Sequence, residues 1–314
     1  MHCETVDRGA AKKAHKQKVG RIVLRAGNRV NRVASATVAC TKAHADNRPM
    51  PRDPWQDRIE RAKQLAARFP FATQVLHFYI HIAAFQRDLH SSLEHSSSRT
   101  QSTRSTPAAP PELSELLKSF PNFLQVINKY GSEPLAARAA DLSSESADVH
   151  ADLLDRFWTE QYSNDGLGDF TARAFLQPYA EFLRSLSANT FENYTRSPCP
   201  FCGREPGFGV LRQQGDGGRR FLVCSFCLAE WPFRRILCPG CGEEDHKKLP
   251  VYTAEEMPYL RVECCDNCGR YLKTVDLTKD GLAVPLVDEI AAIHLDLWAQ
   301  EHGYTKLKTN LMQL

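Results

Sequence analysis

Hydrophobic residues recur at helical spacing from Asp53 onward. The stretch "WQDRIERAKQLAARF" places one apolar residue on the same helix face every three or four positions. That face consists of Trp55, Ile59, Ala62, Leu65, Ala66 and Phe69. Asp53 can cap this helix, Pro54 suits its first position, and Pro70 is expected to end it. A second stretch, Phe71–Leu93, is apolar around more of its circumference, which predicts a helix buried between neighbours.

A polar segment separates these helices from a second helical block. Glu94–Pro111 is rich in Ser, Thr and Pro and offers little apolar surface to bury, so it is expected to be a linker. Amphipathic helices are then predicted in three stretches: 112–130, 134–162 and 169–190, with a kink at Pro178 in the last. Together these elements predict a helical domain over residues 51–196.

After Ser197 the pattern changes to short β-rich pieces such as "RRFLVC", "LRVEC" and "YLKTVDL". A final helix is predicted from Leu286 to Gly303, with one apolar stripe along it. The stripe consists of Leu286, Ile290, Ile293 and Leu297. The order of elements predicts an α+β multidomain protein, with an all-helical N-terminal domain, strand-rich modules and a C-terminal helix.

Eight of the eleven cysteines form four C-x-x-C pairs within the strand-rich region. The pairs are Cys199/Cys202, Cys224/Cys227, Cys238/Cys241 and Cys265/Cys268. The first and second pairs are separated by 21 residues, the third and fourth by 23, and the middle two by only 10. This spacing predicts two successive zinc ribbons, each closing four thiolates around one zinc or iron ion.

Residues within the knuckles support metal binding. A glycine follows Cys202, Cys241 and Cys268, where it can adopt positive φ and turn backbone N–H groups toward the sulfurs. Leu228 follows Cys227 instead, so that knuckle departs from the pattern. Cys264 could replace Cys265 as a ligand, but Cys265 preserves the C-x-x-C spacing.

Other chemistries fit the cysteines less well. A thioredoxin-like redox pair would begin a helix after a strand, and four such pairs do not fit that arrangement. A site of four thiolates has no open position for water or substrate, so metal-dependent hydrolysis is disfavoured and no catalytic residue is predicted. His77 and His81 are four residues apart on one helix, but no third ligand is evident beside them.

Charge argues against nucleic acid as the partner of the ribbons. Residues 197–273 contain 11 Lys and Arg and 10 acidic residues, a net charge of +1. Each metal centre with four thiolates adds about −2. The metal-loaded region is therefore expected to be near −3, a poor match for a phosphate backbone.

The whole-chain net charge of +3 hides an uneven distribution. Residues 1–50 carry 11 Lys and Arg against 3 acids, whereas residues 51–314 carry 29 against 34. The first 50 residues are expected to be a basic, disordered extension. "VASATVAC" within them faintly resembles a lipoprotein cleavage site, but it is too short and polar for an ordinary signal core.

No apolar run is long enough to span a membrane, and paired cysteines favour a reducing compartment, so a cytoplasmic protein is expected.

The motifs "CPFCG", "RRFLVCSFCLAEW", "RILCPGCGE", "ECCDNCGRYLKT" and "LDLWAQEHGY" together resemble the FdhE family, accessory proteins of formate dehydrogenase biogenesis. The similarity covers residues 197–310 and extends more weakly to the helices from Asp53. It implies a helical domain followed by two rubredoxin-like metal modules, at 197–236 and 237–284, and a C-terminal helix and tail at 285–314.

The resemblance also implies a cytoplasmic, non-enzymatic role with the formate dehydrogenase catalytic subunit as partner. The four cysteine pairs carry over as ligands of two metal ions, iron or zinc. Two other functions remain open from the residues alone: a rubredoxin-like electron carrier and a ribbon-type nucleic-acid binder.

Overall fold

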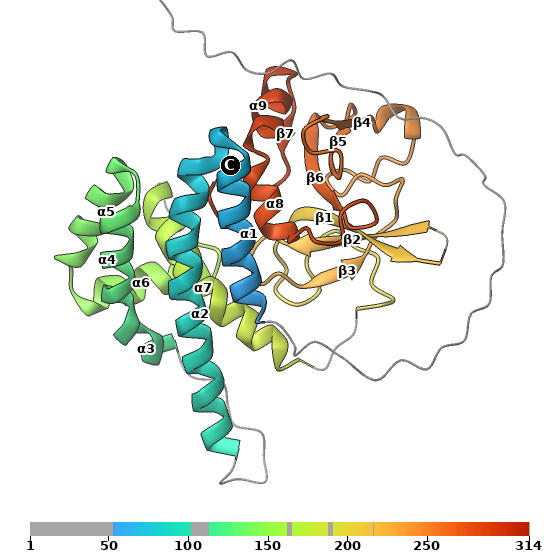
Figure 1. Cartoon of the computed structure of the whole chain (residues 1–314). Helices are drawn as coiled ribbons and strands as arrows, with labels where there is room; N and C mark the ends of the chain where they lie inside the picture. The colour runs from blue at the N-terminus through green and yellow to red at the C-terminus, as the bar shows by residue number, and fades with distance from the viewer. Residues whose placement is uncertain (1–52, 102–112, 162–164, 188–190, 216, 314) are drawn as a thin grey trace, which may run out of the picture.

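The computed structural model describes residues 53–101, 113–161, 165–187, 191–215 and 217–313. A helical N-terminal part lies beside a sheet, with two C-terminal helices between them (Figure 1). This arrangement confirms the predicted α+β class. The predicted basic extension, with Cys3 and Cys40, lies outside the described residues.

The N-terminal part contains the helices α1 Pro54–Arg68, α2 Thr73–Gln101, α3 Leu113–Leu116, α4 Phe120–Tyr130, α5 Glu133–Ser143, α6 Ala147–Trp158 and α7 Gly166–Ser185. The Asp53 side chain accepts a hydrogen bond from the Trp55 amide at 3.0 Å, which confirms the predicted cap of α1. The predicted apolar face of α1 is buried against α2 and α8. Pro178 lies inside α7.

Helix α2 is longer than predicted and continues into the expected linker as far as Gln101 (Figure 1). Two serines near this polar end donate hydrogen bonds to the carbonyl one turn earlier. Ser92 Oγ donates to Asp88 O and Ser96 Oγ to Ser92 O, both at 2.9 Å. Residues 102–111 of the expected linker lie outside the described part of the chain.

The sheet is assembled from strands β1 Pro206–Gln214, β2 Gly217–Cys224, β3 Glu230–Pro232, β4 Val251–Thr253, β5 Leu260–Cys265, β6 Arg270–Asp276 and β7 Thr305–Lys306. Their order is β3-β2-β1-β6-β5-β4, with β7 paired to β6. The two cysteine-containing segments are joined because β1 pairs in parallel with β6. Gly209 lies against Thr274 at this junction, where a Cβ atom would overlap the threonine side chain. The two ribbons therefore share one continuous sheet.

The C-terminal segment forms two helices, α8 Pro285–Ala291 and α9 Ile293–Glu301, where one had been predicted. The break falls at Ala292, with ψ of 39°. Lys273 Nζ, from β6, donates to the carbonyls of Glu289 and Ala292 at 2.6 and 3.3 Å. The break rotates α9, so that Leu295 and Trp298 are buried while Leu297, part of the predicted stripe, is 55% exposed.

Buried ion pairs hold the helical part against the C-terminal half. Arg61 of α1 donates to the Asp288 carboxylate of α8 at 2.6 Å, and Asp288 is fully buried. Arg173 of α7 donates to the carbonyls of Ser225 and Asn310, each at 2.7 Å. These contacts connect distant parts of the sequence within one body. Among the described residues, no helix is both long and apolar enough to cross a membrane.

Asp276, at the end of β6, makes the fold sensitive to acid. Burial alone would raise its pKa, but Thr278 and Arg261 stabilise the carboxylate and hold the pKa below the ordinary value for aspartate. Because the folded pKa is depressed, this stabilisation is present above the unfolded pKa and is lost as pH falls through the folded value. We expect Asp276→Asn to unfold more easily at pH 7 and to lose less stability than wild type between pH 5 and 3, measured by urea unfolding. An unchanged acid dependence would contradict this role.

Candidate metal centres

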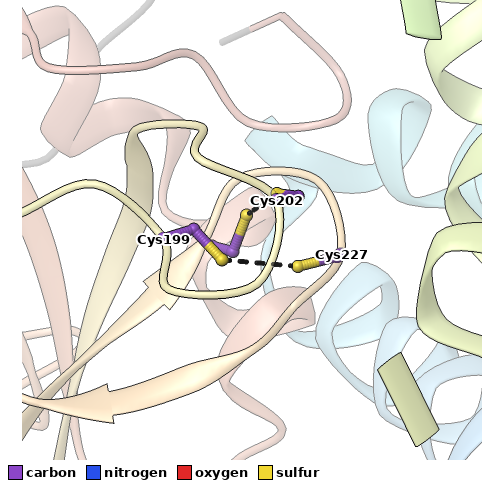
Figure 2. A group of neighbouring side chains, drawn as sticks. Cys199, Cys202 and Cys227 are labelled. Carbon is purple, nitrogen blue, oxygen red and sulfur yellow. Dashed lines mark hydrogen bonds between the residues drawn. The ribbon is translucent and has the colours of Figure 1, made fainter. Parts of the chain in front are cut away.

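The first cluster brings together Cys199, Cys202, Cys224 and Cys227, with all four sulfurs within 4.8 Å of one another. Cys199 and Cys202 come from the knuckle before β1, Cys224 is the last residue of β2, and Cys227 lies in the turn that follows. The Sγ atoms of Cys199 and Cys227 are 3.6 Å apart, and those of Cys202 and Cys224 are 3.4 Å apart. Figure 2 shows the sulfurs of Cys199, Cys202 and Cys227 pointing toward a common centre.

The second cluster repeats this arrangement with Cys238, Cys241, Cys265 and Cys268. The Sγ distances between Cys238 and Cys268 and between Cys241 and Cys265 are both 3.7 Å. The structure thus brings together all eight cysteines singled out in the sequence, in the expected pairing of knuckles. Cys264, the alternative to Cys265, points away from this cluster.

The backbone at each knuckle turns with positive φ. Gly203, Gly242 and Gly269 have φ of 79°, 79° and 65°. Leu228 takes the corresponding position after Cys227 with φ of 53°, which a leucine rarely adopts. The departure from glycine therefore changes the residue and leaves the turn intact, at the cost of local backbone strain.

Hydrogen bonds to sulfur orient the thiols. The amides of Phe201, Phe226 and Gly240 donate to Cys199, Cys224 and Cys238 Sγ, at 3.4, 3.4 and 3.3 Å. The side-chain amide of Asn267 donates to Cys241 Sγ at 3.5 Å and lowers the pKa of that thiol to about 7. Such donors stabilise thiolates and are typical of the surroundings of metal-bound cysteine. The sequence analysis missed Asn267, although its place inside the last knuckle was a usable signal.

The sulfur spacing fits a tetrahedral ion. With metal–sulfur bonds of about 2.3 Å, the sulfurs at the corners of a tetrahedron are about 3.8 Å apart. The four distances above, 3.4 to 3.7 Å, are close to that value. Four sulfur ligands in this geometry suit zinc or iron.

The pKa values of the thiols in the first cluster also favour a bound metal ion. Neighbouring thiols that donate hydrogen bonds to Cys202 lower the pKa of Cys202. Neighbouring sulfurs that accept hydrogen bonds from the Cys227 thiol raise the pKa of Cys227. Four thiols this close cannot all ionise together because their negative charges repel. A divalent cation would remove this conflict, since it binds all four as thiolates.

The two clusters differ in burial. In the first, three cysteines are buried and Cys202 is partly exposed; in the second, Cys241 is exposed and Cys268 partly so. The first cluster is also packed against the helices. Arg204, after its first knuckle, donates to Phe157 O of α6 at 2.6 Å and lies over the ring of Phe226 at 3.9 Å.

The remaining candidates from the sequence lie elsewhere. Cys264 is buried on the face of the sheet opposite Cys265, and burial raises its pKa to about 12. His81 stacks on Tyr130 with ring centroids 3.5 Å apart. Within the described ranges, only the two cysteine clusters form a group that could hold a metal, so His77 and His81 belong to none.

The fold and the clusters define a class: a helical protein joined to a tandem pair of zinc-ribbon-like modules. Comparison with known families identifies residues 198–235 as the FdhE central domain and residues 236–313 as the FdhE C-terminal domain. An FdhE homolog of Aquifex aeolicus is 32% identical over 81% of this chain and 93% of its own. The chain belongs to the FdhE family.

Further relatives agree with this assignment. An FdhE homolog of Pseudomonas aeruginosa is 37% identical over 38% of this chain and 41% of its own. The crystal structure of the FdhE protein from the same species superposes with a TM-score of 0.62, at 25% identity, over 83% of this chain and 96% of that one. The similarity of the fold therefore extends to the helical part as well as to the ribbons.

Proposed function

We propose that the eight clustered cysteines bind two metal ions, one in each ribbon, and that the metals are iron or zinc. The observation that carries this proposal is the tetrahedral spacing of sulfurs in both clusters. Zinc would supply a rigid structural centre, whereas iron would add one-electron chemistry. In either case each ribbon holds four thiolates, orients them with N–H donors and leaves no open coordination position.

The biological role we infer is that of a cytoplasmic accessory protein that binds the formate dehydrogenase catalytic subunit during its maturation. Membership of the FdhE family supports this role, and the closed coordination of both clusters supports a non-enzymatic protein. The same proposal divides the chain into a helical domain at 51–196, metal modules at 197–236 and 237–284, and a C-terminal segment at 285–314.

Affinity capture tests the role directly. The tagged full-length chain is purified from its host grown without oxygen, and co-purifying proteins are identified by mass spectrometry. Recovery of a formate dehydrogenase catalytic subunit supports the accessory role, with Cys224→Ser as a control for the need for intact ribbons. Recovery of nucleic acid or of an unrelated redox enzyme in its place would contradict it.

Elemental analysis of protein prepared without oxygen distinguishes the two metals. Two iron ions with reversible visible absorption would give the protein electron-transfer capacity. Zinc in both centres would exclude that capacity and leave a structural role.

The difference in burial predicts that the two ions leave at different rates. Cys241 is exposed and the second cluster opens to solvent, so a chelator can reach that ion without unfolding the helical part. We expect EDTA to remove the ion of the second cluster about tenfold faster than the ion of the first. A tenfold ratio corresponds to an activation barrier for metal release that is lower by about 1.4 kcal/mol. Cys241→Ser should abolish the fast phase and leave the slow one. Equal rates would contradict the structural asymmetry.

A further inference from the structure

A groove lies beside the second metal cluster, on the face of the sheet turned away from α8 and α9. Alternation along β6 defines the two faces. Tyr271 and Lys273 point to α9, where both bind Asp296, so Arg270 and Leu272, which alternate with them along the strand, point the other way. The groove has a volume of about 490 Å³, within the range of ligand sites.

Apolar side chains on the rim of this groove are open to solvent. Ile236 precedes the third knuckle and is 52% exposed; Val251 begins β4 and is 38% exposed. Both line the groove, together with Leu249 and Leu307. Exposed apolar residues that share one hollow are typical of a surface that binds a partner.

Arginines are the most numerous charged side chains in the lining of the groove. Its lining contains Arg220, Arg235, Arg261 and Arg270 but only one carboxylate, Glu263. Arg220 is paired with Glu263 at 2.6 Å, and Arg261 is paired with Asp276. These two pairs are internal to the fold, so Arg235 and Arg270 are the arginines that remain for contact with a ligand.

Arg235 and Arg270 are the weakly compensated cations. Arg270 is 3.7 Å from Glu205, and both side chains are about half exposed. Arg270 also lies against Gly240 in the knuckle, where it faces the negative charge of the four thiolates. Among the described residues Arg235 has no carboxylate partner, and its side chain donates a 3.4 Å hydrogen bond to Gly218 O.

We propose that this groove binds an extended segment of the client protein in which an acidic side chain pairs with Arg235 and the apolar side chain two residues away, on the same face of the segment, lies between Ile236 and Val251. The proposal rests on the proposed function for the identity of the client. Charge disfavours residues 1–50 of this chain as the occupant, because they carry 11 Lys and Arg against 3 acids.

Two sets of peptides test the groove with the metal-loaded full-length chain by fluorescence anisotropy. One set tiles the formate dehydrogenase catalytic subunit. The other is designed, with Glu two residues from Leu in a neutral background, and with Gln or Lys replacing the Glu. We expect tiled peptides with an acid two residues from an apolar residue to bind, and the designed Glu-Leu peptide to bind about tenfold more tightly than its Gln form.

Charge reversal gives the sharpest comparison. Arg235→Glu should weaken the Glu-Leu peptide by at least about tenfold and restore binding of the Lys form. Ile236→Ser should weaken both Glu and Gln forms by about tenfold. Two matched controls lie outside the groove: Arg234→Glu, whose exposed side chain pairs with Glu244, and Leu282→Ser, which is 81% exposed. Both should bind peptide within about twofold of wild type.

Three results would overturn the proposal. Either no peptide binds, or Arg235→Glu leaves peptide binding unchanged, or Arg235→Glu changes the oligomeric state. The last result would make the groove a contact between copies of this chain.

Failure of the proposed function can be distinguished from failure of the groove proposal. If the wild-type chain captures no catalytic subunit but the designed peptides bind with the expected charge dependence, the groove stands and the client is a different protein.

Discussion

Replacement of Cys224 by serine should remove one of two metal ions and unfold the first ribbon. Cys224 is fully buried, and its sulfur is 3.4 Å from that of Cys202. Water from outside therefore cannot take the place of the lost sulfur as a ligand of the ion. Structural zinc sites supply roughly 10–16 kcal/mol in small peptides, compared with roughly 5–15 kcal/mol of net stability for a whole domain. Losing even part of that binding energy is therefore enough to unfold the module.

The measurement combines metal content with thermal unfolding followed by circular dichroism. In Cys224→Ser we expect one ion per chain, a lower first transition, and helical signal that persists above it. Cys264→Ser is the matched control, because Cys264 is also buried in this region yet lies outside both clusters. It should retain two ions and lose at most about 1–3 kcal/mol. Two ions in Cys224→Ser would refute the ligand assignment.

We expect the unfolding to spread from the first ribbon into the helical part, because the first ribbon is not an isolated module. Arg204 joins its first knuckle to α6, and Arg173 and Gln177 of α7 donate to the carbonyls of Ser225 and Phe226 in its second. Loss of the first centre should thus loosen the helical part more than loss of the second, which Cys241→Ser would test. The second cluster makes no comparable contact with α6 or α7 in the described structure.

Local patterns were sufficient to predict most of the helices of the N-terminal part and the grouping of the eight cysteines. The face of α1 follows from its spacing, and the choice of Cys265 over Cys264 follows from C-x-x-C, because both depend only on residues close in sequence. Neighbouring strand residues point to opposite faces, so only one of two adjacent cysteines can reach the cluster.

Features that depend on distant partners were not predictable in this way. The parallel pairing of β1 with β6 joins Gly209 to Thr274, and nothing in either strand alone specifies the other. Lys273 in "YLKTVDL" resembles an exposed residue of an alternating strand, yet it is fully buried. Its partners Glu289 and Asp296 lie in the C-terminal helices, and the same lysine accounts for the break at Ala292 that the apolar stripe did not indicate.

The second large effect is expected from this lysine. Lys273 Nζ lies 3.0 Å from Glu289 Oε1 and 2.5 Å from Asp296 Oδ2, and Lys306 bridges the same two carboxylates from the other side. Burial alone would lower the pKa of Lys273, but Asp296 and Glu289 raise it above the ordinary value, so the lysine is charged in the fold. Removing one member of a buried network leaves an uncompensated charge, which costs about 3–5 kcal/mol.

Lys273→Met should therefore lower the free energy of unfolding by about 3–5 kcal/mol in urea titrations, while retaining both metal ions. Lys248→Met is the matched control, since Lys248 pairs with Glu243 at the surface with 51% of its side chain exposed, and its loss should cost at most about 1 kcal/mol. Adding Asp296→Asn to Lys273→Met removes one of the stranded charges. The double variant should be more stable than the sum of the single effects by roughly 0.5–3 kcal/mol. Strict additivity would show that Lys273 acts through packing alone, and the charge network would then have no part in holding α8 and α9 on the sheet.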